Sequence, residues 1–199
     1  ASFTLAFWVL PASFAVPADA KLRIRRLVRL VDAWPEQSVF LETRESGVLA
    51  FSAGYRGKDG SQVSAGTFSR TALRTNAWTH LACVFDRGER KARIFLNGVL
   101  DAQGELAADF DGDFNSEKPS LIGSGWQGAS GCIDDFKLWK RALNASEIAA
   151  EHRAVKGKYE GSASAPVAAS GASATRAPSP SPVEAPAPLR PGPALTFYL

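Results

Sequence analysis

The sequence predicts an antiparallel β-sandwich that ends in one short helix and a disordered tail rich in Ala, Ser and Pro. Short runs of β-branched and aromatic residues alternate with turn residues over most of the chain before residue 145. An Asn-Gly pair at 97–98 lies between two such runs and marks a tight hairpin. Only one capped helix start follows these runs, and strands do not alternate with helices as they would around a parallel sheet.

Three apolar runs form the first part of the predicted sandwich. SFTLAFWVL at 2–10 is the first strand, and KLRIRRLVRLV at 21–31 is the second, although its apolar residues also fit a helical stripe. The strand-rich neighbourhood of that second run favours a strand. SVFLETRESGVLAFSAG at 38–54 follows. Within it ETRES at 42–46 fits a hairpin turn better than a strand, in which its two glutamates would lie on opposite faces.

Two consecutive hairpins are predicted in the middle of the chain. Strands at 81–85 and 90–96 flank an Asp-Arg-Gly-Glu turn, and a third strand at 99–102 follows Asn97 and Gly98. A type I′ Asn-Gly turn needs positive φ at both residues and matches the twist of the strands that it joins. These three strands are therefore expected to be neighbours in one sheet.

The last two predicted strands are SLIGSGW at 120–126 and GCIDDFKLW at 131–139. Three tryptophans, Trp8, Trp78 and Trp139, lie in the predicted strands or at their starts. We assign these tryptophans to the core, because large aromatic side chains on strands usually pack inside.

A capping pattern fixes the start of the helix. Asn144 is a good N-cap, and the Glu147 carboxylate stands where it reaches back to the N–H of the cap residue. The helix is therefore predicted to begin at Ala145. Leu143 and Ile148 have the spacing of a hydrophobic staple, which sets the angle at which the chain enters the helix.

Composition divides the 199-residue chain near residue 156. The chain is 45% hydrophobic, enough for a substantial core, but 162–193 contains almost no large apolar residue and cannot repay its ordering entropy by burial. Its prolines favour an extended, semi-rigid spacer. We therefore expect a sandwich domain at 1–155, an Ala/Ser/Pro-rich linker at 156–193, and the apolar start of a following domain at 194–199.

Charge and hydropathy exclude few functions. The net charge of +3 permits binding to polyanions without requiring it. No apolar run reaches the length of about 18 residues that spans a bilayer, so membrane insertion is not expected. Since no Met occurs, even at position 1, we expect that the chain begins inside a longer gene product or after a processing site.

Three segments in their order resemble the laminin-G-like jelly roll of the concanavalin A-like and pentraxin-like sandwich proteins. They are FTLAFWVLP at 3–11, NAWTHLACVFDRGERKARIFLNGVL at 76–100 and SLIGSGWQGASGCIDDFKLWKRALNASEI at 120–148. The resemblance covers about residues 2–153. It implies a jelly roll whose closing strand is followed by a short packed helix, as at 131–148.

The resemblance also implies a strand before the first one seen here. Members of the family usually carry a further strand and loop ahead of an FTLAFWV-like strand, whereas this chain starts with Ala1 and Ser2. Two explanations are open: the chain is trimmed or precedes a second similar domain, or PALTFYL at 193–199 returns to fill the place. We favour the first, because a long disordered loop that closes a sheet costs entropy.

No catalytic constellation is visible, and the chain is not expected to be an enzyme. His80 lies where the family usually carries a structural His, and His152 lies late in the helix, neither with a nucleophile partner in sequence. Sandwich-fold glycoside hydrolases need two carboxylates close together on one strand face. No such pair is evident in this sequence.

An acidic loop is the best candidate for a metal site. Asp109, Asp111, Asp113 and Asn115 place oxygen ligands at alternate positions, which suits a structural Ca²⁺ ion. The loop is not an EF-hand, because its glycine and its last acidic ligand are misplaced, and a solvated turn remains the alternative. Asp134 and Asp135 are the second candidates, because the family resemblance implies that an acid of this closing strand helps to hold a structural calcium or caps backbone amides. The GSGWQG loop lacks the carboxylates of the pentraxin-type double site.

Two features suggest a ligand surface. Trp126 in a glycine-rich loop could stack on a sugar ring, with Gln127 bonding hydroxyls, or could cover its own core. Lys21, Arg23 and Arg25 would form a positive ladder on one strand face, suited to acidic glycans, or would only protect an edge strand. Aromatics are not interleaved with these cations, so nucleic acid is not an expected partner.

Cys83 and Cys132 are the only cysteines, and neither belongs to a CxxC unit, so zinc is not expected. Each lies on a predicted strand. If those strands are neighbours in an oxidising compartment the two could form a disulfide; otherwise they are two buried thiols.

The sequence as a whole predicts a secreted or surface-displayed, non-catalytic recognition module on an Ala/Ser/Pro linker. Glycan or adhesion binding is the leading function, with a glycan or an extracellular protein as ligand and domains of the same polypeptide as neighbours. Two alternatives stay open. The sandwich could be a structural domain that packs on sister domains without a sugar, or an accessory module of a secreted enzyme.

Overall fold

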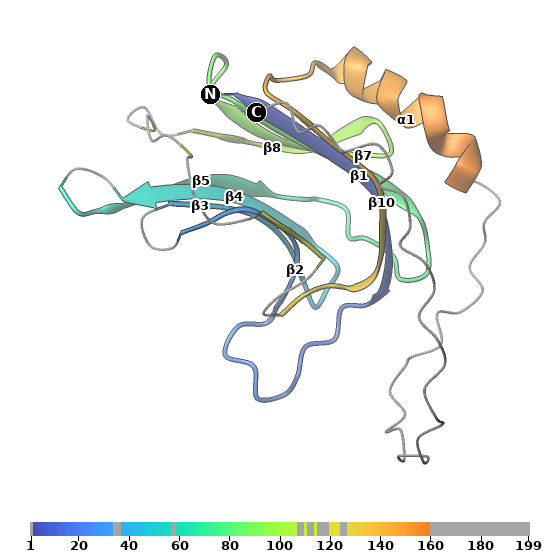
Figure 1. Ribbon diagram of the computed structural model, residues 1–199, viewed down its shortest axis with the longest axis horizontal. Coiled ribbons are helices and arrows are strands. Elements are labelled where there is room, and N and C mark those ends of the chain that lie inside the picture. Colours follow the sequence, from blue (N-terminus) through green and yellow to red (C-terminus); the bar gives the residue numbers. More distant parts are fainter. Residues whose placement is uncertain are drawn as a thin grey trace, which may run out of the picture. The chain divides into compact units, whose positions relative to one another are not determined.

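The computed structural model confirms the predicted antiparallel sandwich with one short helix. It describes residues 2–33, 37–56, 59–106, 110, 114, 120–123 and 127–159. Two five-stranded sheets face each other, and one helix lies against the outside of the sandwich (Figure 1). The elements in chain order are β1 (Phe3–Ser13), β2 (Ile24–Ala33), β3 (Gln37–Arg44), β4 (Leu49–Arg56), β5 (Gln62–Phe68), β6 (Thr79–Asp86), β7 (Lys91–Leu96), β8 (Val99–Glu105), β9 (Leu121–Ile122), β10 (Ser130–Trp139) and α1 (Ala145–Tyr159).

The strand order brings the first and the last strand together. One sheet has the order β10-β1-β6-β7-β8, and the other has the order β5-β4-β3-β2-β9. All pairings between these strands are antiparallel. The last strand therefore pairs with the first, and β9 and β10 are the end strands of their two sheets.

Aromatic rings from both sheets fill the space between them. Phe7 and Phe85 in one sheet and Phe51 in the other are each 1% exposed or less. The Phe3 ring stacks on Phe85 at 5.4 Å between centroids and meets Phe51 edge-on at 6.2 Å. Offset-stacked and edge-on ring pairs add stability beyond the area that they bury. This packing fixes the two sheets relative to each other.

The two predicted hairpins are confirmed. β6, β7 and β8 are consecutive neighbours in one sheet. Asn97 has φ 50° and Gly98 has φ 79°, the positive values that a type I′ turn requires. The Asn97 side chain also accepts a hydrogen bond from the His80 N–H at 3.0 Å, which ties the turn to the start of β6.

Several strands differ from their predicted extent, among them β5, β3 and β9, the last limited to Leu121–Ile122. β5 was not predicted, because its central Ser-Ala-Gly run is a weak strand signal and only β4 among the described strands pairs with it. The prediction of a turn at ETRES is only partly right. β3 continues through Arg44, and the chain turns after that residue, before β4. The Arg44 carbonyl closes this turn by accepting the Gly47 N–H at 2.9 Å.

Helix α1 covers the outer face of the sheet that contains β1, β6, β7 and β8 (Figure 1). Ile148 is fully buried there beside Leu143, the predicted staple partner, in a cluster with Val84 and Phe95 from the sheet. The helix continues past residue 155 to Tyr159, whose ring stacks at 4.2 Å on Trp8 of β1. This stack explains why composition alone placed the end of the folded region too early.

The reciprocal cap at the helix start is present as predicted. The Glu147 N–H donates to Asn144 Oδ1 at 3.0 Å, and the Asn144 N–H donates to Glu147 Oε2 at 2.9 Å. We expect Asn144→Ala to lower the free energy of unfolding by about 1 kcal/mol, because the N–H groups of the first turn lose their acceptor. Urea unfolding followed by circular dichroism measures this. Asn144→Ser keeps an acceptor and should stay near wild type; an equal loss in both variants would contradict the capping role.

Candidate functional site

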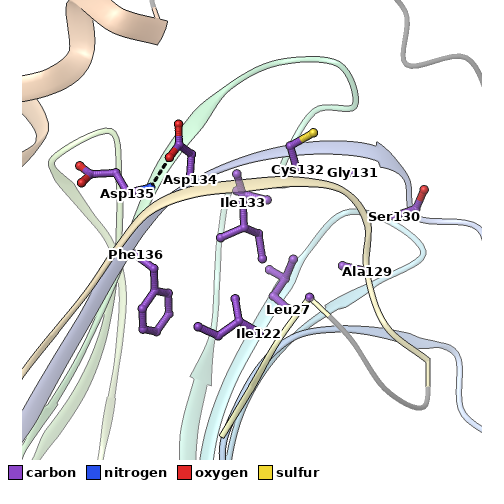
Figure 2. Close-up of a pocket in the computed structure, with 12 residues that line it drawn as sticks. Leu27, Ile122, Ala129, Ser130, Gly131, Cys132, Ile133, Asp134, Asp135 and Phe136 are labelled. Carbon is purple, nitrogen blue, oxygen red and sulfur yellow. Dashed lines mark hydrogen bonds between the residues drawn. The ribbon is translucent and has the colours of Figure 1, made fainter. Parts of the chain in front are cut away.

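An open cleft lies between the end strands of the two sheets. It has a volume of about 380 Å³. Ile122 of β9, Leu27 of β2 and Ile133 of β10 form its apolar floor, and their side chains lie close together in Figure 2. Ile122 is 42% exposed. The cleft is therefore an apolar surface that water reaches.

A bulge in β10 decides which side chains face the cleft. Asp135 has φ 52°, and the pairing with β1 shifts register between Trp8–Asp134 and Ala6–Lys137. Such a bulge places an extra residue on one strand and changes the direction of the side chains around it. In Figure 2 Ile133 and Phe136 point inward, while the carboxylates of Asp134 and Asp135 point away. The cleft therefore has an uncharged floor, although two acidic residues lie on its rim.

The loop beside the cleft is fastened to β2. The Gly123 N–H donates to the Leu27 carbonyl at 2.7 Å, and the Arg26 N–H donates to the Gln127 carbonyl at 2.8 Å. The Gln127 side-chain amide also donates to the Leu22 carbonyl at 2.7 Å. Gln127, predicted to bind a ligand, thus lies next to the basic segment predicted as a separate feature. Trp126, the other predicted ligand residue of this loop, lies outside the described residues.

The predicted ladder of Lys21, Arg23 and Arg25 on one strand face is wrong. β2 begins only at Ile24, so Lys21 and Arg23 precede it. Only Arg25 of the three therefore lies on the strand. The three cations therefore do not form one regular row.

Internal contacts occupy two of these cations. Arg23 binds the Glu45 carboxylate with two bonds, Nε to Oε2 at 2.9 Å and Nη2 to Oε1 at 2.5 Å. Arg25 donates to the Ala15 carbonyl, from Nε at 2.7 Å and also from Nη2. The pKa of Glu45 is lowered, mainly by its hydrogen bond from Arg23. These arginines hold the β1–β2 loop, and their charge is less available to a ligand than the sequence suggested.

The residues predicted to bind calcium are only partly described. Asp109, Asp111, Asp113 and Asn115 lie outside the described residues. Asp134 accepts a hydrogen bond from Lys158 of α1 at 2.7 Å, which lowers the pKa of this carboxyl. Its other oxygen accepts the Asp135 N–H at 2.7 Å. Asp134 thus anchors the end of the helix, and within the described ranges no three His, Cys, Asp or Glu residues cluster as metal ligands.

The two cysteines cannot pair in this fold. Cys83 is opposite Leu5 on one side of β1, and Cys132 is opposite Leu10 on its other side. Two strand spacings and this offset separate their Cα atoms by on the order of 20 Å, far beyond disulfide reach. Both are free; Cys83 is buried, which raises the pKa of its thiol, and Cys132 is exposed. The disulfide alternative is therefore wrong, and so is the expectation that both thiols are buried.

The histidines lie in an aromatic cluster under α1. His80 is 3% exposed, with its ring 5.4 Å from Trp8 and 5.5 Å from His152. Burial, with smaller effects from His152 and Lys137, lowers the pKa of His80 to about 4. The carboxylates of Glu151 and Asp135 oppose this shift with smaller effects. Burial among these rings fits the structural role expected for His80.

Glu42 is the most buried acid of the predicted ETRES turn. It lies on β3 between Arg26 at 3.8 Å and Arg44 at 3.9 Å. Burial raises its pKa, although both arginines act in the opposite direction. Its two ion-pair partners in the described chain are therefore cations. No helix within the described ranges is both long and apolar enough to cross a membrane.

The two antiparallel sheets, the covering helix and the cleft at the sheet ends define a lectin-like β-sandwich domain. The chain belongs to the concanavalin A-like lectin/glucanases superfamily, whose laminin-G-type family model matches residues 1–149. The family predicted from the sequence is therefore confirmed. None of the curated proteins matches the chain.

Several solved structures share this fold at low identity. The CBM40 module of Ruminococcus gnavus IT-sialidase, bound to α2,3-sialyllactose, is 17% identical with a TM-score of 0.52; the match covers 76% of this chain and 82% of the module. A putative carbohydrate-binding protein from Bacteroides ovatus is 19% identical with a TM-score of 0.52, over 74% and 40% of the two chains. The binding domain of Paraclostridial Mosquitocidal Protein 1 is 17% identical with a TM-score of 0.54, over 77% and 37%. This chain therefore spans well under half of the last two proteins.

Proposed function

We propose that this domain is a non-catalytic carbohydrate-binding module whose sugar lies in the cleft between β9 and β10. The observation that carries the proposal is the cleft itself, a water-accessible hollow of about 380 Å³ with an apolar floor. Sites for small ligands have volumes of about 300–1,000 Å³ and combine apolar walls with a few polar groups. The cleft is at the small end of this range and fits a short glycan end.

The chemistry of the lining suits one face of a sugar ring. Ile122, Ile133 and Phe136 offer apolar surface to the C–H groups of a pyranose. Ser130 and the backbone of Gly131 lie at the rim and could exchange hydrogen bonds with hydroxyl groups. Gln127, already fixed to Leu22, holds the neighbouring loop so that little ordering is needed on binding.

The arginine contacts favour a sugar recognised by shape over a strongly sulfated chain. Binding of polyanions needs cations that are free to meet the ligand, and Arg23 and Arg25 already bind Glu45 and Ala15. The fold neighbours from Ruminococcus gnavus and Bacteroides ovatus, by their titles a sialyllactose-bound module and a putative carbohydrate-binding protein, support the general class of ligand.

The proposal includes a setting outside the cell, as a secreted or surface-displayed module of a larger protein. The composition of 162–193 supports this, because an Ala/Ser/Pro-rich segment acts as a spacer between domains. A structural Ca²⁺ ion in the acidic loop at 109–115 stays part of the proposal, and the binding assay should therefore be run with calcium and with a chelator.

Binding of the full chain to an array of neutral, sialylated and sulfated glycans tests the function. We expect binding to a neutral or sialylated glycan, and about tenfold weaker binding in Ile122→Ser, because the ligand loses apolar contact worth about 1.4 kcal/mol. Leu138→Ser is the matched control: Leu138 is also a β-strand residue, is 47% exposed, and is not part of the cleft lining. Its binding should equal that of wild type.

Two results would overturn the proposal. One is the absence of binding to every glycan with calcium and with chelator, which would favour a structural or assembly domain. The other is equal loss of binding in Ile122→Ser and Leu138→Ser with folding intact, which would place any sugar outside the cleft.

A further inference from the structure

A second hollow lies where β7 ends and β6 begins, away from the cleft. Its volume is about 300 Å³. Leu73 and Leu96 supply apolar surface, while Trp78, Arg74 and Asn97 supply an aromatic ring, a cation and an amide. Neither the cleft between β9 and β10 nor the sequence motifs account for this combination of residues.

The loop at 69–78 that forms most of this hollow is irregular but firmly attached. The Ser69 N–H donates to the Leu49 carbonyl at 2.9 Å, and the Leu73 N–H donates to the Gly47 carbonyl at 2.9 Å. The Asn76 N–H donates to the Pro11 carbonyl at 2.7 Å. The loop is thus tied to β4, to the turn before β4 and to the end of β1.

A carboxylate reinforces the start of the same loop. Asp101 of β8 accepts the N–H of Arg70 at 2.6 Å and the N–H of Thr71 at 3.2 Å. Gly47 packs so tightly beneath that a Cβ atom there would lie 2.6 Å from the Leu73 carbonyl oxygen. A loop held from several directions keeps its side chains in place before a ligand arrives, which lowers the cost of binding.

The side chains at the hollow have complementary chemistry. Trp78 is partly exposed, so its assignment to the core from the sequence was wrong. Tyr159 of α1 holds its ring from one side with 4.9 Å between centroids. Arg74 is exposed, and among the described residues no carboxylate forms an ion pair with it. An aromatic face binds the C–H face of a sugar ring, and a guanidinium binds a carboxylate with two parallel hydrogen bonds.

We propose that this hollow is a second ligand site, for a sugar that carries a carboxylate, with the ring on Trp78 and the acid group on Arg74. Asn97, fixed in its turn by the hydrogen bond from His80, lies at the rim where it could meet a hydroxyl. This site does not depend on the cleft between β9 and β10, because the two hollows share no lining residue.

Titration of the isotopically labelled full chain with sodium glucuronate and, separately, with glucose tests the proposal by NMR. Glucuronate should shift the backbone signals of Thr71, Arg74, Trp78 and Asn97 and bind at least fivefold tighter than glucose at these residues. Arg74→Gln should reduce glucuronate affinity to the level of glucose. Arg70→Gln is the matched control, since Arg70 is an exposed arginine of the same loop outside the hollow, and it should behave as wild type.

The location of the shifts separates this proposal from the proposed function. Shifts confined to Ile122, Gly123 and Ile133 would support binding in the cleft and overturn the second site. Glucuronate affinity that is unchanged in Arg74→Gln, or equal for glucose and glucuronate in wild type, would also overturn it. So would the absence of any shift around Trp78. Trp78→Ala is not used as a test, because this variant would also remove the contact between the Trp78 and Tyr159 rings.

Discussion

Gly131→Ala is expected to lower the free energy of unfolding by about 3 kcal/mol. Gly131 has φ 138°, a conformation that residues with a Cβ rarely adopt, at a cost of about 1–3 kcal/mol. A Cβ atom there would also lie 2.1 Å from the Leu10 carbonyl oxygen and 2.9 Å from the Ala12 nitrogen, both rigid backbone atoms of β1. β1 and β10 would have to move apart, at a further cost of about 1–3 kcal/mol. Because Gly131 lines the cleft, glycan binding should weaken as well.

Urea unfolding of matched glycine variants measures this effect. Gly157→Ala is the control, because Gly157 lies in α1, and a Cβ there meets no heavy atom within 4 Å. It should be neutral or stabilising by up to about 1 kcal/mol, since Ala has the higher helix propensity. Opposite signs for the two substitutions are expected. A loss below about 1 kcal/mol in Gly131→Ala would show that the close approach of β1 and β10 is not essential.

Acidification is expected to destabilise the domain through His80. The pKa of His80 is lowered to about 4 by burial under α1, whereas an unfolded chain has the ordinary value of 6.5. The folded state therefore binds this proton less readily than the unfolded state. Its contribution to stability is fully present above pH 6.5 and is lost as the pH falls from 6.5 towards 4. The shift corresponds to about 3 kcal/mol between these limits.

The comparison of wild type with His80→Gln isolates this contribution from that of the carboxylates. Free energies of unfolding are measured for both proteins at several values between pH 7.5 and 4.5. The wild-type curve should fall more steeply below pH 6.5, while His80→Gln is less stable at neutral pH but loses less on acidification. Parallel curves would mean that His80 binds its proton equally well in the folded and unfolded states.

Local chemistry explains which parts of the fold were predictable. The helix start at Ala145 depends on Asn144 and Glu147, which act within one turn, and both of their hydrogen bonds are present. The hairpin at Asn97 and Gly98 depends on two residues whose preferred φ suits a single turn type. Signals of this kind need no information about distant residues, and they were confirmed.

Long-range contacts explain what the sequence did not reveal. The helix reaches Tyr159 because its ring stacks on Trp8, far away in the chain. The Arg23 and Arg25 side chains bind Glu45 and Ala15, so the regular row expected from alternation is absent. Each of these contacts depends on the order of strands in the sheets, which no local pattern contains.

The candidate site was only partly predictable for the same reason. Gln127 was singled out from its glycine-rich loop; it is not a lining residue of the cleft, and its side chain binds the Leu22 carbonyl. The apolar floor comes from Leu27, Ile122 and Ile133 on three different strands, each of which reads as an ordinary strand residue in sequence. The one sequence feature that hinted at this floor was Ile122, an apolar residue next to a glycine in a short strand.

The most direct test of the central claim is to map the bound sugar on the labelled full chain by NMR, using the glycan that binds best on the array. The account predicts shifts at Ile122, Gly123, Ala129 and Ile133, and in a folded Ile122→Ser variant about tenfold weaker binding by the shifts at Gly123, Ala129 and Ile133. Shifts that avoid these residues, or a chain that binds no glycan at all, would contradict a carbohydrate site in the cleft between β9 and β10.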